Sequence, residues 1–192
     1  MGFFSKKTKP FVIGVCGRSC SGKSTIIKEL EERYRGKVLH IIQDKFFKVN
    51  SDNWESPNSL RLDRLIYSIK KLKSGKSTHI PNHGWTEVFD REVKPQKVII
   101  VEGYLLFVNE ELSSLFDKKI WIDVSDTNLL YRRTKRDGTG KHIDYTMNIV
   151  IPESKKYEEI QREKADIIID GNKSKDKIIE EVEKQIKKWR AI

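Results

Sequence analysis

Residues 17–24 read GRSCSGKS, the most informative stretch of the chain. It fits the pattern G-x-x-x-x-G-K-[ST], in which glycines let the backbone curl so that successive N–H groups point at phosphate oxygens. The apolar residues 11–15 precede it and predict a buried strand, and residues 26–34 follow it with apolar side chains at helical spacing. Strand, glycine-rich loop and helix are the context of a phosphate-binding loop, or P-loop. This context favours a P-loop over a glycine turn that binds nothing.

The residue types of the P-loop indicate its ligands. Lys23 can place its ammonium on the β- and γ-phosphates of a nucleotide, and the hydroxyl of Ser24 can ligate Mg²⁺. We therefore predict ATP as the phosphate donor, Mg²⁺ as the cofactor and Lys23 as a catalytic residue. The loop residues expected to bind the nucleotide are Gly17, Ser19, Ser21, Gly22, Lys23, Ser24 and Thr25.

Length and charge limit the class of protein. A chain of 192 residues predicts one domain, residues 1–192, that is large enough to bury a core. The net charge of +10 admits nucleic-acid binding, but much of it comes from lysines scattered over predicted helix surfaces, such as Lys70 and Lys187. We therefore prefer a solvated basic surface to a nucleic-acid footprint.

The sequence carries no membrane or secretion signal. No apolar run approaches the roughly 18 residues that span a bilayer, and the apolar stretch at the N-terminus is too short for a signal peptide. We predict a cytoplasmic protein that does not bind membranes. Cys16 and Cys20 are expected to be free thiols rather than a disulfide or a zinc site. The oligomeric state stays open, a homo-oligomer included.

Apolar runs alternate with helical patterns along the chain. The runs that predict strands are residues 11–15, 38–42, 98–101, 120–124 and 167–169. Helical patterns cover residues 60–72 and 178–189, and Asp126 is expected to cap another helix that runs to about Arg136. The alternation predicts an α/β protein, a three-layer P-loop fold around a five-stranded parallel sheet.

Two segments leave this regular pattern. Residues 45–93 are expected to form a small excursion on the substrate side of the sheet, with a hairpin within residues 78–93. Residues 136–150 are predicted to form a lid. It begins with the polar, glycine-rich residues 137–141, which we expect to be a mobile loop.

Two carboxylates follow predicted strands. Asp44 comes directly after residues 38–42, and a carboxylate at the carboxyl end of a parallel strand points into the ligand crevice. We predict that Asp44 is the catalytic base for an acceptor hydroxyl rather than a turn cap. Glu102 ends the strand 98–101, and we expect it to hold Mg²⁺ with Ser24 rather than to lie in solvent.

Arginines and aromatic residues supply the remaining candidates. Arg133 and Arg136 lie at the start of the lid and could close over phosphates, with an ordinary charged helix face as the alternative. We expect Arg136 to contact the nucleotide and Arg133 the acceptor. Trp85, more than Trp54, could stack on a base, and Glu55 could accept ribose hydroxyls; alternatively, both Trp side chains only anchor loops.

These motifs together resemble the uridine kinase and nicotinamide riboside kinase group of P-loop kinases, from about residue 11 to residue 189. Residues 17–24 look like its G-x-S-x-S-G-K-S, and residues 43–47 resemble its Q-D-x-F-[YF]. The resemblance implies that Asp44 is the catalytic carboxylate and that Phe47 binds substrate. Further similar stretches are residues 101–107 to E-G-[IF]-L-[LA]-F, 132–137 to R-R-x-x-R-D, and 155–157 with 165–169 to K-K-Y-A-D-V-I-I.

The resemblance implies a kinase that phosphorylates the 5′-hydroxyl of a nucleoside. Departures from the group's pattern leave the nucleoside open. Residues 81–85 stand where uridine kinases usually carry P-x-Y-D-F, no clear His follows to read uracil, and Glu55 stands where the group tends to have Asp. Residues 46–48 and 104–107 look closer to nicotinamide riboside kinases. Nicotinamide riboside, or another small alcohol such as pantothenate, is therefore an alternative acceptor.

Two other classes predict different behaviour. A regulatory GTPase needs N-K-x-D to read guanine, and residues 172–176 miss this pattern because Lys175 stands where the Asp belongs. A nucleic-acid-stimulated ATPase would show turnover that rises with nucleic acid and falls steeply with salt. A non-catalytic member of the kinase group is a further alternative.

Overall fold

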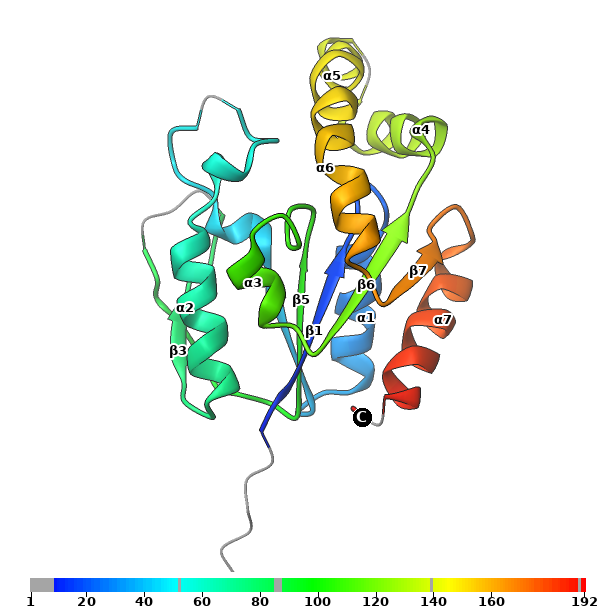
Figure 1. The fold of residues 1–192 in the computed structure, drawn as a ribbon. Helices are drawn as coiled ribbons and strands as arrows, with labels where there is room; N and C mark the ends of the chain where they lie inside the picture. The colour runs from blue at the N-terminus through cyan, green and yellow to red at the C-terminus, as the bar shows by residue number, and fades with distance from the viewer. Residues whose placement is uncertain (1–8, 52, 85–87, 139, 190) are drawn as a thin grey trace, which may run out of the picture.

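The computed structural model describes residues 9–51, 53–84, 88–138, 140–189 and 191–192. Its centre is a five-stranded sheet in the order β2-β5-β1-β6-β7, and every neighbouring pair in it is parallel (Figure 1). This confirms the predicted fold class. The strands are β1 (Phe11–Cys16), β2 (Val38–Ile42), β5 (Val98–Gly103), β6 (Lys118–Asp123) and β7 (Ile167–Asp170).

Helices cover both faces of the sheet, which gives the three layers in Figure 1. One face packs against α1 (Lys23–Arg33) and α7 (Lys175–Lys188), and the other against α2 (Leu62–Lys73) and α3 (Glu110–Ser114). Successive residues of a strand point to opposite faces, so Ile13 lies in the α1 and α7 core while Val12 lies in the other core. Because both faces are covered, the strands read as continuous apolar runs.

The segment between β2 and β5 contains the expected hairpin. β3 (Thr78–Ile80) pairs antiparallel with β4 (Arg91–Val93). Before it, the short helix η1 (Gln43–Phe46) follows β2 directly, and η2 (Pro57–Ser59) precedes α2. A bridge between Phe47 and Leu60 closes the loop that joins these two short helices. Phe47 packs beside Tyr104 and Leu105, which directly follow β5.

The segment between β6 and β7 is helical almost throughout. It contains α4 (Asp126–Asp137), α5 (Lys141–Tyr145), a π-helical turn η3 (Thr146–Val150) and α6 (Ile151–Glu163). The predicted loop 137–141 is shorter in the structure, because Asp137 still belongs to α4 and Lys141 already begins α5.

The predicted cap of α4 was wrong by one residue. Ser125 is the N-cap, because its backbone is extended and its hydroxyl accepts a hydrogen bond from the N–H of Asn128 at 3.3 Å. Asp126 lies in the first turn and instead pairs with Arg18 and Lys155. Within the described part of the chain, no helix combines the length and the apolar character that crossing a bilayer requires.

Candidate nucleotide and acceptor site

The P-loop joins β1 to α1 and curls at two residues with left-handed backbone. Cys20 has φ 58° and Gly22 has φ 98°. The conformation at Gly22 favours glycine, and Gly22 caps the first turn of α1. At Gly17 the reason for glycine is space, because a Cβ there would lie 2.5 Å from the carbonyl oxygen of Ile122. The loop therefore keeps its shape through both conformation and close packing.

Lys23 points back over the loop from the first turn of α1. Its Nζ donates to the carbonyl oxygens of Gly17 at 2.7 Å and Arg18 at 2.8 Å, and to Oγ of Ser21 at 3.3 Å. The side chain is buried, but it lines two cavities of the molecule. The ammonium is thus held by backbone carbonyl groups of the loop itself.

Glu102 lies within β5, whose last residue is Gly103, and it is 3% exposed. It accepts a hydrogen bond from the Ser24 hydroxyl at 2.7 Å, and Nε2 of the buried His40 lies 3.8 Å from the same oxygen. That second distance is longer than a hydrogen bond. Burial raises the pKa of Glu102, but His40, Lys23 and Ser24 outweigh burial and lower it. Glu102 is therefore held as a carboxylate.

Gln43 fixes the carboxyl end of β5. Its Oε1 accepts hydrogen bonds from the N–H groups of Tyr104 and Leu105, both at 3.0 Å. A Cβ at Gly103 would lie 2.3 Å from this Oε1, so only glycine leaves room for the amide. The amide of Gln43 therefore ties β5 to the helix that carries Asp44.

Asp44 occupies the first turn of η1, directly after β2 as predicted. Solvent reaches its side chain through an open cleft, although protein surrounds it on the other sides. Desolvation by this surrounding protein raises the pKa of Asp44 to about 6; the charge of Glu102 raises it further, whereas Lys23 and Arg136 lower it. A carboxylate with a pKa near neutrality can both accept and release a proton.

Two cavities meet at the P-loop. The first has a volume of about 500 Å³ and is lined by residues 20–26, by Arg132 and Arg136, and by Lys173, Lys175 and Ile178. The second, of about 480 Å³, contains Asp44, Glu55 and Glu102. Both are lined by Cys20, Lys23, Ser24 and Arg136. We call them the nucleotide cavity and the acceptor cavity, after the ligands that the sequence predicts for the residues lining them.

The acceptor cavity is lined by aromatic and acidic side chains. Phe47 meets Trp54 edge-to-face, with ring centroids 5.2 Å apart, and Tyr104 donates a hydrogen bond to the carbonyl oxygen of Trp54. Glu55 is buried at 8% exposure; this burial raises its pKa, although Arg133 lowers it. The cavity thus offers flat apolar surfaces together with a carboxylate that can accept hydrogen bonds.

The arginines of α4 reach the P-loop. Arg133 donates from Nη1 to Oγ of Ser19 at 3.0 Å and lines the acceptor cavity. Arg136 lines both cavities and pairs with Asp137 at 2.6 Å. The predicted arginines therefore lie at the site rather than on an unrelated helix face.

The structure thus brings most of the predicted site residues together. Ser19 lines the acceptor cavity, and Ser21 and Thr25 line the nucleotide cavity, whereas Gly17 lines neither and supplies a carbonyl oxygen to Lys23. The prediction for Trp85 falls outside the described residues. Free thiols at Cys16 and Cys20 are confirmed.

Several lining residues were absent from the predicted set. Tyr104 lies within residues 101–107, a motif that could have identified it as a site residue. Tyr145 lies in no recognised motif. Lys173 and Lys175 line the nucleotide cavity. They belong to residues 172–176, the stretch that misses the N-K-x-D pattern. Their position depends on where the β7–α7 connection lies, which sequence spacing does not give.

The donor atoms at the junction of the cavities suit Mg²⁺. The described residues contain no group of three or more His, Cys, Asp or Glu side chains that could hold a metal ion by themselves. Mg²⁺ needs no such cage, because it usually binds one or two carboxylates together with substrate phosphates and water. Ser24 and Glu102 present two hard oxygen donors 2.7 Å apart beside the P-loop. The residues therefore fit this ion.

Comparison with known proteins agrees with this geometry. The chain is 33% identical to a uridine kinase of Chlamydia pneumoniae, over 84% of this chain and 82% of that protein. Among solved structures, a possible uridine kinase from Bacillus stearothermophilus matches with a TM-score of 0.61 at 20% identity, covering 86% of this chain and 91% of that one. A shikimate kinase from Acinetobacter baumannii matches with a TM-score of 0.58 at 12% identity, covering 92% and 93%. These two structures share the fold.

The family model named phosphoribulokinase/uridine kinase matches residues 36–177, which begin after the P-loop and include Asp44, Glu102 and the arginines of α4. The match covers well over half of the chain. This chain is therefore a kinase and belongs to the phosphoribulokinase/uridine kinase family.

Proposed function

We propose that this kinase transfers the γ-phosphoryl group of ATP to the 5′-hydroxyl of a nucleoside and requires Mg²⁺. One observation carries the proposal: the nucleotide cavity and the acceptor cavity share Lys23, Ser24 and Arg136. A triphosphate on the P-loop would end where the acceptor cavity begins. Asp44 lines the acceptor side of this junction, where a hydroxyl would approach.

The transfer needs one bond made and one broken. The 5′-oxygen of the acceptor bonds to the γ-phosphorus, the bond from that phosphorus to the β–γ bridging oxygen breaks, and ADP leaves. The hydroxyl proton passes to the carboxylate of Asp44 and then to solvent. Lys23 and Arg136 offset the negative charge that spreads over the transferring group.

Ser24 and Glu102 are the residues that would hold Mg²⁺. When bound, this ion would neutralise part of the negative charge of the phosphates. We also propose that residues 1–192 form one kinase domain, that residues 136–150 act as a lid over the junction, and that the excursion 45–93 binds the acceptor. In support, Phe47 and Glu55 line the acceptor cavity from the excursion, and Tyr145 lines it from the lid.

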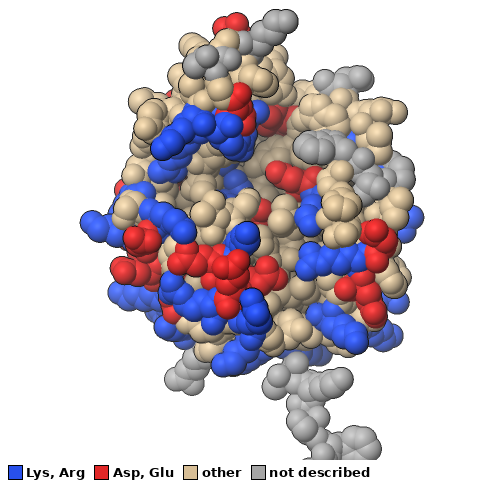
Figure 2. Space-filling model, turned by 180° about the vertical axis from the view of Figure 1, so that it is seen from behind, with Lys and Arg blue, Asp and Glu red and all other residues tan. Residues whose placement is uncertain are grey.

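A nucleoside suits the acceptor cavity because flat aromatic walls and a buried carboxylate match a base and ribose hydroxyls. The relatives named uridine kinase support the same class. The exposed charges give less support to a nucleic-acid partner, because acidic side chains are interspersed with Lys and Arg over the face in Figure 2. The cytoplasmic location and the oligomeric state stay open predictions.

A coupled assay of ADP release tests the proposal. It would use Mg-ATP with uridine, cytidine, purine nucleosides, nicotinamide riboside or pantothenate. We expect turnover with at least one ribonucleoside, and loss of that turnover in Asp44→Asn. Turnover of pantothenate alone would reject the nucleoside while leaving the kinase mechanism. Turnover only after nucleic acid is added would favour an ATPase of the other class.

A further inference from the structure

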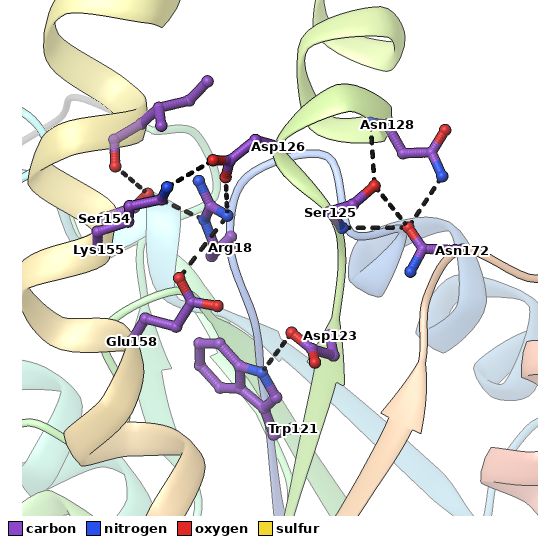
Figure 3. A network of polar contacts seen from close by, with 11 residues as sticks. Arg18, Trp121, Asp123, Ser125, Asp126, Asn128, Ser154, Lys155, Glu158 and Asn172 are labelled. Atoms are coloured by element: carbon purple, nitrogen blue, oxygen red, sulfur yellow. Dashed lines mark hydrogen bonds and ion pairs between the residues drawn. The ribbon is translucent and has the colours of Figure 1, made fainter.

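Arg18, the second residue of the P-loop, is buried at 3% exposure although it carries a charge. Its side chain lines neither cavity and lies between α4 and α6, as Figure 3 shows. Nε donates to Oγ of Ser154 at 3.0 Å, and Nη1 donates to Oδ1 of Asp126 at 2.6 Å. The same Nη1 lies 3.7 Å from Oε2 of Glu158. One P-loop side chain thus contacts both helices.

These contacts compensate for the burial of the Arg18 charge. A buried guanidinium is stable only when carboxylates and hydrogen-bond acceptors surround it. Asp126 supplies a charge-assisted bond and is itself held by Lys155 at 2.5 Å. Nη2 of Arg18 has no hydrogen-bond partner among the residues that the structure describes. Arg18 is therefore held through Nε and Nη1, and these two nitrogens contact two different helices.

The two partner helices flank the lid. α4 leads into residues 136–150, and α6 leads out of them. α4 also contacts the loop directly, because Arg132 donates to the carbonyl oxygen of Cys20 at 3.3 Å and Arg133 reaches Ser19. The backbone carbonyl oxygen of Arg18 accepts a hydrogen bond from the ammonium of Lys23. Arg18 thus stands between the lid helices and the lysine of the P-loop.

We propose that Arg18 is a positioning residue that couples the lid helices α4 and α6 to the phosphate-binding loop. The inference rests on the proposed use of the P-loop for ATP, and Arg18 itself touches no substrate. When a nucleotide binds the P-loop, the contacts of the Arg18 guanidinium with Ser154 and Glu158 reduce the motion of α6. By reciprocity, loss of the guanidinium weakens nucleotide binding. A lysine cannot replace the arginine, because a single ammonium lacks the planar fork that reaches both helices.

The test compares wild type, Arg18→Met, Arg18→Lys and a matched control, Arg162→Met. Arg162 lies in α6 and also pairs with a carboxylate, because its Nε is 3.6 Å from Oδ2 of Asp123. None of its described contacts reaches the P-loop. Hydrogen exchange is followed over the P-loop and residues 151–163, with and without ADP. Calorimetry gives the affinity for ADP, and a thermal scan of each variant checks folding.

In wild type and Arg162→Met, we expect ADP to slow exchange in both regions. In Arg18→Met, ADP should slow exchange in the P-loop alone, and its affinity should fall about tenfold, within the usual range of coupling between sites. Arg18→Lys should resemble Arg18→Met. If Arg18→Met does not fold, the double variant Asp126→Ala with Ser154→Ala deletes both side-chain acceptors of the guanidinium and should give the same pattern.

Three results would overturn the proposal. One is an unchanged response of residues 151–163 to ADP in the variants, even if their melting temperature falls, because Arg18 would then be only structural. The second is no response of these residues in wild type. The third is a full rescue by lysine. The proposed nucleoside acceptor fails separately, since ADP binding does not depend on which acceptor is turned over.

Discussion

The Ser24 hydroxyl donates a hydrogen bond of 2.7 Å to Oε1 of Glu102 across a gap of 78 residues in the sequence. The bond joins the first turn of α1 to the carboxyl end of β5. It puts a hydroxyl and a carboxylate side by side where the nucleotide and acceptor cavities meet. The proposed Mg²⁺ site is thus assembled by the order of the strands.

Glu102→Gln should raise the concentration of Mg²⁺ needed for half-maximal turnover. The amide keeps the shape and can still meet Ser24, but it removes the negative charge that attracts a divalent ion. Mn²⁺ titration in the presence of ADP, followed by electron paramagnetic resonance, should show weaker binding independently of activity. Glu92→Gln, at an exposed position on β4, is the control. Equal metal affinity in wild type and Glu102→Gln would refute this assignment.

Lys23→Ala should fold normally and lose about 10² or more in kcat/KM, since a pre-positioned charge on the γ-phosphate would be absent. Steady-state kinetics and a thermal scan measure both effects. Lys28→Ala, on the exposed side of the same helix, is the matched control. Wild-type turnover by a folded Lys23→Ala enzyme would remove the basis for placing ATP on this loop.

Asp44→Asn should keep the affinity for ATP and lower kcat by about 10² to 10⁴, the usual effect of losing a general base. ATP binding is measured by calorimetry and turnover by ADP release. Asp90→Asn changes an exposed aspartate of the excursion and should behave as wild type. A loss of ATP affinity with unchanged kcat would assign Asp44 to nucleotide binding instead.

The pH dependence of kcat/KM should show one acidic limb. The pKa of Asp44 is raised to about 6 by the surrounding protein, and a base works only when deprotonated. Below about pH 6, kcat/KM should therefore fall about tenfold per pH unit, and above it the profile should level off. Water in the open cleft screens the carboxylate, so the limb should lie at or just below pH 6. The limb should vanish from the residual activity of Asp44→Asn.

Ribose recognition by Glu55 should appear as poor use of 2′-deoxynucleosides. A site that hydrogen-bonds a hydroxyl rejects the analogue lacking it, because a buried polar group is then left unpaired. Steady-state kinetics on matched ribo- and deoxyribonucleosides should show a difference of about 10² or more in kcat/KM. In Glu55→Ala the two substrates should become nearly equal. Equal use of both by wild type would show that Glu55 does not read the ribose.

The sequence by itself determined the core of the fold. Local spacing is enough to recognise the strand, P-loop and helix of residues 11–34, because each depends on the conformational preferences of neighbouring residues. It also placed Asp44 at the end of β2 and Glu102 on β5, since a parallel sheet brings all strand carboxyl ends to one edge. For the strands of the central sheet and for α4, the predictions differ from the structure at boundaries, such as the cap at Ser125.

Only the tertiary structure decided which distant residues meet. Arg18 and Asp126 are 108 residues apart in the chain, and nothing in the local pattern shows that a P-loop arginine lines neither cavity. The same holds for Gln43, whose amide fills the space that Gly103 leaves beside β5. Such contacts depend on strand order and helix packing rather than on neighbouring residues, which is the physical reason why spacing along the sequence predicts the elements but not the contacts between them.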